Sequence, residues 1–200
     1  DTAVFTLGTN HVYVARATGE IVDNCQKRPQ REFEERELTV EECADALREA
    51  ITLLRQAHPK VNVIITVSPI RYAKYGQHGS QLSKAVLLLA ADKVIKEEGE
   101  RVYYFPAYEI VNDELRDYRF YKADMLHPNE QAVEYIWEQL VATCFSAEAK
   151  QFMEEWRPIK EALAHRPFHP EAAAYQDFIK KTKEKAKMLE LKYPNIELNL

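Results

Sequence analysis

The order of the elements predicted along the chain indicates an α/β fold built around a parallel sheet. Short apolar strands are expected at 2–7, 61–67 and 102–105, and each precedes a predicted helix. Strands that alternate with helices form parallel sheets through right-handed crossovers. The middle strand is almost wholly apolar and β-branched, which is typical of a strand covered on both faces.

The first predicted strand ends at Gly8, and a hairpin is expected directly after it. Residues 11–16 and 20–24 favour two extended segments that turn back at Thr18-Gly19. A glycine between two short runs of β-forming residues is a hairpin signal. The hairpin therefore separates the first strand from the first helix.

Local signals mark the three helices. Thr39 and Glu42 have the spacing of a capping box, and apolar residues recur at helical intervals over 39–58. A polar loop with two glycines then leads to a buried helix over 83–95. The third helix is expected over 130–145, directly after a proline.

The character of the chain changes after the third helix. Residues 147–163 and 171–193 are charged, helix-forming stretches with sparse apolar stripes, separated by two proline-containing breaks. We therefore predict an α/β domain over 1–145 and a helical appendage over 146–200. The appendage is expected to wrap the domain or to contact a protein partner.

Composition narrows the classes of function. A net charge of −5 and the lack of a basic stripe argue against a nucleic-acid partner. No apolar run is long enough to span a bilayer, and no signal peptide is recognisable. Three cysteines without a paired spacing fit a reducing, cytoplasmic setting. No glycine-rich phosphate loop is present, so nucleotide cofactors have no support.

The first residue is Asp1, which lies within the run that predicts a strand. The chain contains no methionine before this strand. We therefore expect these 200 residues to be a fragment, a processed product or a truncated form of a longer protein.

Ligands of parallel sheets bind at the carboxyl ends of the strands. The segments that follow the predicted strands are therefore candidate site segments. They are Gly8-Thr9-Asn10, 68–71, 106–109 and the loop that contains Asp124 and His127.

Asp124 and His127 have the spacing of a catalytic pair. A carboxylate three residues before an imidazole can bind one ring nitrogen and leave the other free as a general base. Pro128 is expected at the first helical position, which places His127 at or beside the helix N-cap. The alternative is that His127 only caps the helix and Asp124 is a solvated turn residue.

Other residues of the same segments have alternatives of their own. Asn10 can form an Asx turn, and Ser68 can be a nucleophile or a pocket-lining donor. Arg71 can bind an anionic substrate group or pair with a loop carboxylate. The carboxylates considered for that pairing are Glu109, Asp113 and Asp117.

Several segments together resemble the GSCFA family, a branch of the SGNH/GDSL-type hydrolase superfamily. They are Thr6-Leu-Gly-Thr9, Asn24-Cys25 with Lys27, Thr66-Val-Ser-Pro-Ile-Arg71, Leu115-Arg-Asp-Tyr-Arg-Phe-Tyr121 and Asp124-Met-Leu-His-Pro128. The resemblance covers about the first 145 residues. It implies a three-layer, flavodoxin-like α/β fold and acyl hydrolysis or transfer through a serine.

The resemblance also implies roles for particular residues. The Asp-x-x-His block corresponds to Asp124 and His127, and a Gly-x-Asn block corresponds to Gly8 and Asn10, whose side-chain amide would stabilise an oxyanion. Ser68 and Arg71 are expected to bind substrate. The family's serine motif is absent from this chain. We therefore expect the nucleophile, with its strand and helix, to come from upstream sequence.

Three hypotheses follow. The first is a serine esterase or acyltransferase that acts on a small-molecule or glycan acyl ester without a metal or organic cofactor. The second is a catalytically inactive binding or scaffolding domain that uses its C-terminal helices. The third is a metal hydrolase with Asp124, His127 and His11 as ligands.

The first hypothesis makes a geometric prediction. The Asp124 carboxylate should lie within hydrogen-bond reach of His127 Nδ1, at the carboxyl edge of the sheet. Asn10 should share a pocket with His127, because a base and an oxyanion donor must approach the same acyl carbon. The sheet should have an open edge nearby.

Overall fold

A computed structural model describes residues 1–22 and 24–198 of the chain. Asp23, which falls within the predicted second arm of the hairpin, lies outside the described residues. The structure divides into two compact units, Asp1–Trp137 and Glu138–Leu200. The division falls within a helix, whereas the sequence predicted a boundary after residue 145.

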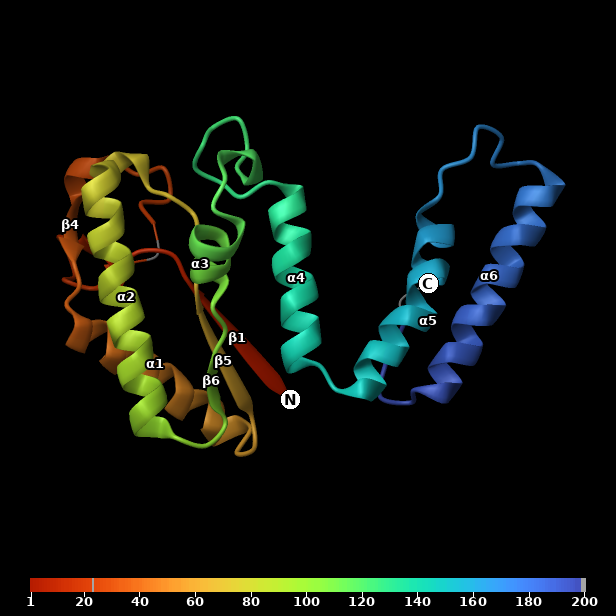
Figure 1. Ribbon diagram of the computed structural model, residues 1–200, viewed down its shortest axis with the longest axis horizontal. Helices are drawn as coiled ribbons and strands as arrows, with labels where there is room; N and C mark the ends of the chain where they lie inside the picture. The colour runs from red at the N-terminus through yellow and green to blue at the C-terminus, as the bar shows by residue number, and fades with distance from the viewer. Residues whose placement is uncertain (23, 199–200) are drawn as a thin grey trace. The chain divides into compact units, whose positions relative to one another are not determined.

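The described residues of the first unit form six strands and most of the helices (Figure 1). The strands are β1 (Thr2–Leu7), β2 (His11–Ala15), β3 (Ile21–Val22), β4 (Phe33–Glu37), β5 (Asn62–Val67) and β6 (Val102–Tyr104). The helices are α1 (Val40–Ala57), α2 (Gly76–Glu98), α3 (Ala107–Glu109) and α4 (Glu130–Cys144), which continues into the second unit. Shorter turns are η1 (Gln30–Glu32), η2 (Ala73–Tyr75), the π-helix η3 (Ile110–Leu115) and η4 (Tyr118–Phe120).

The main sheet is parallel and has the strand order β1-β5-β6. Phe5 of β1 lies opposite Ile65 of β5, and Ile64 of β5 lies opposite Tyr103 of β6. The prediction of a parallel sheet with helical crossovers is therefore confirmed. Among the described strands β1 pairs with β5 alone, so it forms an edge of the sheet.

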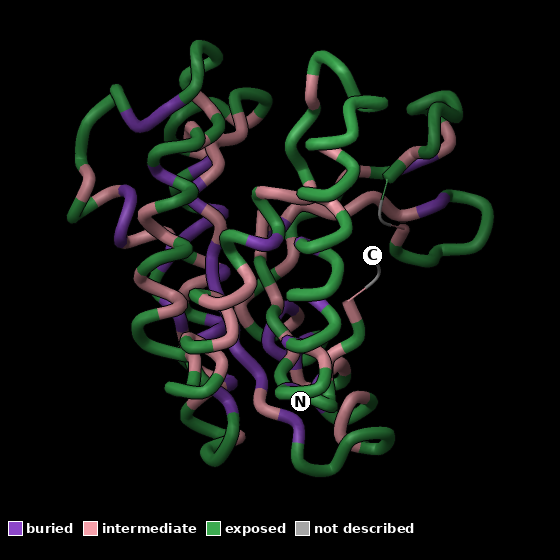
Figure 2. The backbone as a smooth tube through the Cα atoms, turned by 90° about the vertical axis from the view of Figure 1, so that its right-hand side faces the viewer, coloured by how far each residue is buried: buried purple, intermediate pink, exposed green. Residues whose placement is uncertain are grey.

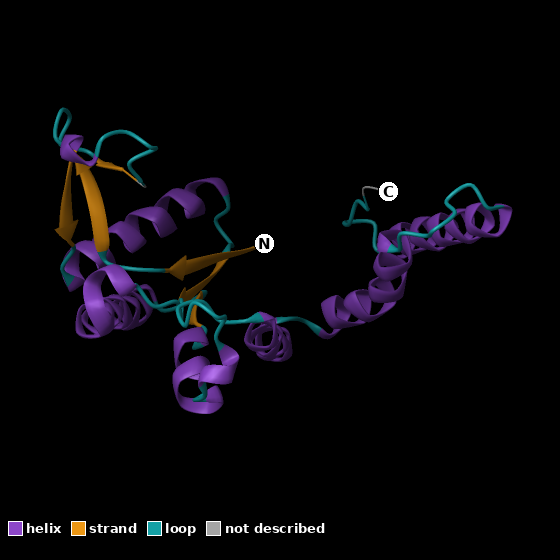
Figure 3. Ribbon diagram, turned by 90° about the horizontal axis from the view of Figure 1, so that it is seen from above, coloured by secondary structure: helices purple, strands orange, loops and turns teal. Residues whose placement is uncertain are grey.

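Helices α1 and α2 cover one face of this sheet (Figure 3). Alternate residues of β5, Val63, Ile65 and Val67, are fully buried against both helices. On the other face Ile64 is buried, but Val4 of the edge strand is 51% exposed. Buried positions therefore gather inside the unit, while the loops and outer helix faces are exposed (Figure 2).

A second, small sheet has the order β3-β2-β4 and is antiparallel. The predicted hairpin is present, since Gly19 N donates to Ala15 O at 2.7 Å. Strand β4 was not predicted, because its sequence Phe-Glu-Glu-Arg-Glu is strongly charged. It is stabilised by charge pairing, as between Glu35 and Lys74.

Helix α2 begins at Gly76, not at Ser83 as predicted. The glycines lower the helix propensity of this segment. Two contacts offset that cost. The ring of Tyr75 stacks on His11 at a centroid distance of 3.5 Å, and Ser80 Oγ accepts a hydrogen bond from Tyr72 N at 3.2 Å. Tertiary contacts thus extend the helix by two turns beyond the prediction.

The second unit contains α5 (Ala147–Ala164) and α6 (Ala173–Lys192), which lie side by side (Figure 1). Ile159, Ala186 and Leu189 form their buried contact, and the ring of Phe152 meets Tyr193 edge-on at 5.2 Å. The expected helices are therefore present. None of the helices in the described part of the chain has the length and apolar character that crossing a bilayer requires.

The buried face of α1 gives a stability prediction. Ile51→Ala should lower the free energy of unfolding by about 2–5 kcal/mol, because it leaves a cavity in the core. Leu53→Ala, on the same helix but at a position 58% exposed, should change it by less than about 1 kcal/mol. Chemical denaturation measures both values, and equal losses would contradict the assigned orientation of α1.

Candidate active site

The Asp124–His127 turn is held together by the Asp124 carboxylate. Its Oδ2 lies 2.6 Å from His127 Nδ1. Its Oδ1 accepts hydrogen bonds from Leu126 N at 2.8 Å and His127 N at 3.0 Å. Met125 adopts a positive φ of 59° so that both amides point at this oxygen. The predicted contact between the carboxylate and Nδ1 is therefore confirmed.

The following helix begins differently from the prediction. Pro128 was expected at the first helical position with His127 at or beside the N-cap, but α4 begins at Glu130. Asn129 carries the capping side chain, since its Oδ1 accepts a hydrogen bond from Ala132 N at 3.1 Å. Asn129 Nδ2 also donates to Arg119 O at 2.6 Å. An asparagine caps better than the residues beside it because its oxygen satisfies a free helix amide. His127 thus lies on the loop before the helix and is not part of it.

The protonation of the pair suits a general base. The backbone amides of His127 and Leu126, and then the imidazole itself, lower the pKa of Asp124 to about 2. The carboxylate is therefore charged at neutral pH and favours the proton on Nδ1. That tautomer leaves the lone pair of Nε2 free. The His127 side chain is 52% exposed, so the base is accessible.

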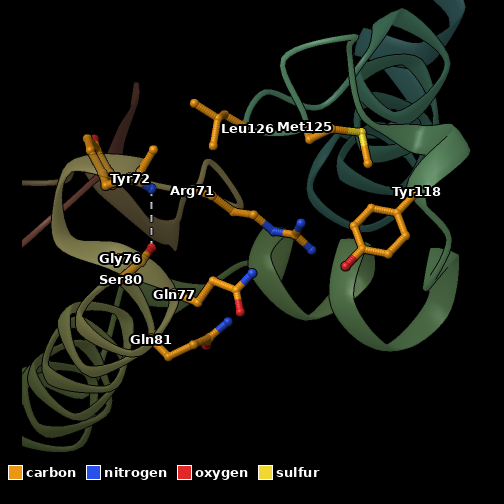
Figure 4. Close-up of a pocket in the computed structure, with 10 residues that line it drawn as sticks. Arg71, Tyr72, Gly76, Gln77, Ser80, Gln81, Tyr118, Met125 and Leu126 are labelled. Carbon is orange, nitrogen blue, oxygen red and sulfur yellow. Dashed lines mark hydrogen bonds between the residues drawn. The ribbon is translucent and has the colours of Figure 1, made fainter.

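The Asp124–His127 turn lies near the carboxyl end of β5. Arg71, four residues after that strand, donates its backbone N–H to Leu126 O at 3.1 Å. A pocket of about 670 Å³ opens between this contact and the start of α2 (Figure 4). It is lined by Arg71, Tyr72, Ala73, Gly76, Gln77, Ser80, Gln81, Tyr118, Met125 and Leu126. The Asp–His turn thus borders a ligand-sized cavity.

Ser68 does not line this pocket. Its Oγ accepts a hydrogen bond from Ile70 N at 3.3 Å, and its backbone N–H donates to Leu7 O at 2.8 Å. Both contacts fix the path of the chain where β1 and β5 end. This position favours a structural role for Ser68.

The Gly8–Asn10 turn follows β1 and is held from α2. Lys84 Nζ donates to Gly8 O, while Ser83 Oγ lies 3.0 Å from Thr9 Oγ1 and accepts a hydrogen bond from Asn10 N at 3.0 Å. Lys84 is 2% exposed and Ser83 is also 2% exposed. Buried polar groups of the helix therefore fix the conformation of this turn.

The geometry of Asn10 differs from the expectation of a shared pocket with His127. Asn10 is 3% exposed, and its Nδ2 donates to Leu38 O at 2.8 Å. The pocket beside the Asp–His turn is lined by other residues. The side-chain amide that was expected to face an oxyanion thus anchors the turn to Leu38, the residue before the N-cap of α1.

Gly8 has a steric reason to be glycine. A Cβ built on it would lie 2.6 Å from the hydroxyl oxygen of Tyr72. A larger residue would therefore displace Tyr72 from the pocket wall. The structure gives Gly8 a role in close packing, in addition to the oxyanion role that the resemblance implied.

His11 does not join Asp124 and His127. It stacks on Tyr75, and its Nδ1 lies 3.8 Å from Glu35 Oε1. Within residues 1–22 and 24–198, no three histidine, cysteine or acidic side chains are arranged to hold a metal ion. The hypothesis of a three-ligand metal site with His11 is therefore wrong.

Sequence reasoning missed the polar face of α2. Ser80, Ser83 and Lys84 are buried, and Leu87 of the hydrophobic core continues the same helix face. Counted from Ser80, these residues follow at three, four and seven positions, which places them on one face of a helix. This spacing was the available signal, because polar residues on the core side of a helix need hydrogen-bond partners inside the protein. The predicted helix began at Ser83, which hid the pattern.

The fold and the site together define the class of protein. It is a mixed α/β protein whose parallel sheet has an Asp–His pair on a loop near the carboxyl end of a strand. The sequence profile of the GSCFA family matches residues 1–140, and that of the GSCFA domain protein C-terminal domain matches residues 156–200. The chain therefore belongs to the GSCFA family. Neither a curated protein nor a solved structure matches it significantly.

The buried lysine of the turn gives a prediction for the pH dependence of stability. Burial lowers the pKa of Lys84 from 10.5 to about 8. Between these values the unfolded chain binds more protons than the folded one, so this group makes stability rise with pH. The unfolding free energy of the wild type relative to Lys84→Met should increase by on the order of 3 kcal/mol from pH 8 to 10.5.

Urea denaturation at several pH values measures this difference. Lys96→Met, which removes a largely exposed lysine from the same helix, is the matched control. A difference between wild type and Lys84→Met that stays constant over this range would contradict the buried position of the ammonium group.

Proposed function

We propose that this domain is an SGNH-type serine esterase or acyltransferase with a three-layer α/β arrangement. The observation that supports this most is the 2.6 Å contact between Asp124 Oδ2 and His127 Nδ1. The pair lies on a loop beside a pocket and near the end of β5, where ligands of parallel sheets bind. Membership of the GSCFA family agrees with the proposal but does not specify an activity.

In the proposed reaction His127 Nε2 takes the proton from a serine hydroxyl as its oxygen attacks the acyl carbon. Asp124 holds the ring and stabilises the imidazolium that forms. His127 then returns the proton to the leaving alkoxide, and an acyl-enzyme remains. Water completes hydrolysis, or a second alcohol completes transfer, with His127 again as the base. The substrate class is a small-molecule or glycan acyl ester, and these steps need no metal or organic cofactor.

The serine of this proposal is not supplied by Ser68, Ser80 or Ser83. The hydroxyls of Ser68 and Ser80 accept backbone hydrogen bonds, and Ser83 is bonded to the turn after β1. We propose that a segment outside these 200 residues carries the nucleophile. No described strand pairs with the outer edge of β1, and this edge, with its exposed Val4, offers a place for a further strand.

The expected substrate-binding and oxyanion residues fit the proposed site to different degrees. Arg71 is kept as a substrate-binding residue, since it lines the pocket. The oxyanion role of Asn10 is not included, because its side-chain amide is buried and donates to Leu38 O. Gly8 is kept as a candidate oxyanion donor through its backbone N–H, since Lys84 binds only its carbonyl oxygen. A cytoplasmic location is also part of the proposal, and the free thiols of Cys25, Cys43 and Cys144 support it.

The catalytic role of His127 is tested in the full-length protein with a short-chain 4-nitrophenyl ester. His127→Ala should reduce kcat by at least about 1000-fold, because no other base replaces it. His58→Ala, which removes an imidazole exposed beside Asp1, should leave the rate within about twofold. A His127→Ala protein with undiminished turnover and an intact fold would refute the proposal.

A second candidate function is a catalytically inactive binding domain. It is favoured by an apolar groove of about 830 Å³ on the second unit, lined in part by Phe178, Met188 and Leu189. Met188 is 66% exposed and Phe178 is 44% exposed, so the groove presents neighbouring apolar side chains at the surface. Full-length protein without any His127-dependent ester turnover would favour this function.

A further inference from the structure

The pocket beside the Asp–His turn contains a cation that forms no ion pair with any acidic side chain of the described residues. Figure 4 shows the Arg71 side chain extending between Gln77 on α2 and Tyr118 on the opposite wall. Ion pairs of the described residues engage Arg16, Arg28, Arg36, Arg48 and Arg55, but Arg71 forms none of them. Its charge is therefore not neutralised by a neighbouring side chain in this part of the chain.

The acidic residues expected to pair with Arg71 are engaged elsewhere or form no ion pair with it. Both carboxylate oxygens of Glu109 accept from the Tyr104 hydroxyl at 2.9 Å. Asp117 Oδ1 accepts from Arg119 N at 2.8 Å, which starts the turn η4. The alternative in which Arg71 pairs with a loop carboxylate is therefore not supported.

Aromatic rings hold the guanidinium in place. Its central carbon lies 4.2 Å from the ring centre of Tyr121 and 5.3 Å from that of Tyr118. Burial raises the pKa of the Tyr121 hydroxyl, and the charge of Arg71 and a hydrogen bond from it partly offset that rise. Stacking on ring faces fixes the guanidinium plane and leaves the N–H groups at its edge able to donate.

A second donor is oriented towards the same pocket. The Tyr108 hydroxyl donates to Gln81 Oε1, so the amide nitrogen of Gln81 is the end left for a ligand. Gln81 and Gln77 stand on consecutive turns of α2 and both line the pocket. The wall opposite the tyrosines therefore presents neutral amide groups and no carboxylate.

We propose that this pocket binds a carboxylate carried by the substrate, with Arg71 as its bidentate partner. This inference rests on the proposed ester chemistry and assigns it a substrate class, namely acyl esters that bear an anionic group. Met125 and Leu126 line the pocket and belong to the same turn as Asp124 and His127. An ester carbonyl near His127 and a carboxylate at Arg71 thus fit one extended substrate. A planar guanidinium matches a carboxylate geometrically.

Two pairs of esters test the proposal in the full-length protein. Mono(4-nitrophenyl) adipate against 4-nitrophenyl hexanoate places the carboxylate on the acyl part. 4-Acetoxybenzoate against its methyl ester places it on the alcohol part. In at least one pair the anionic ester should have the higher kcat/KM, and Arg71→Gln should reduce that preference by about 10- to 100-fold, mainly through KM.

Two further variants separate charge from geometry. Arg71→Lys keeps the charge without the planar fork and should retain part of the preference. Arg119→Gln removes one positive charge from the turn η4, next to the pocket residue Tyr118 but outside the pocket lining, and should leave the preference within about twofold. Absence of a preference in both pairs, or a preference that survives Arg71→Gln, would overturn the inference.

A binding measurement does not depend on catalysis. Calorimetry with adipate on the full-length His127→Ala protein should show binding that Arg71→Gln weakens at least about 10-fold. Equal binding with and without Arg71 would overturn the proposed carboxylate site. Ester turnover that does not depend on His127 would instead refute the proposed function, and the calorimetry would still decide whether Arg71 binds a carboxylate.

Discussion

The geometry of the candidate site depends on one carboxylate and its three donors. Asp124 binds two backbone amides through one oxygen and His127 Nδ1 through the other. The same interaction therefore shapes the turn, fixes the ring and sets its tautomer. It also explains why Met125 can adopt a left-handed conformation, since two charge-assisted hydrogen bonds offset the strain. A carboxylate that only closed the turn would bind the backbone amides and would not contact the His127 ring.

The surroundings of this turn are positioned by polar groups within the first unit. Lys84 and Ser83 hold the chain after β1, and Ser80 holds the backbone of Tyr72, which forms part of the pocket wall. Burying such groups costs stability unless each finds a partner. Their contacts all lead to loops that follow strands. The buried polar groups of α2 thus fix the loops at the carboxyl ends of β1 and β5.

Much of the fold was predictable because its signals are local. The alternation of apolar strands and helices predicted the parallel sheet, and the capping box at Thr39 marked the start of α1. Strand β4 and the first turns of α2 were missed because tertiary contacts, Glu35 with Lys74 and Tyr75 on His11, stabilise them. Asp124 and His127 were found because their contact spans three residues. The hydrogen bond between Asn10 and Leu38 joins two segments that are distant in the sequence, so no local pattern predicts it.

The most direct test of the account is the tautomer of His127, measured by nitrogen NMR of the full-length protein with labelled histidine. The neutral ring should carry its proton on Nδ1, with a strongly hydrogen-bonded proton signal and an unprotonated Nε2. Asp124→Asn should remove that preference, because a neutral amide no longer favours the proton at Nδ1. A wild-type ring protonated mainly on Nε2 would contradict the account, since the nitrogen assigned as the base would then have no free lone pair.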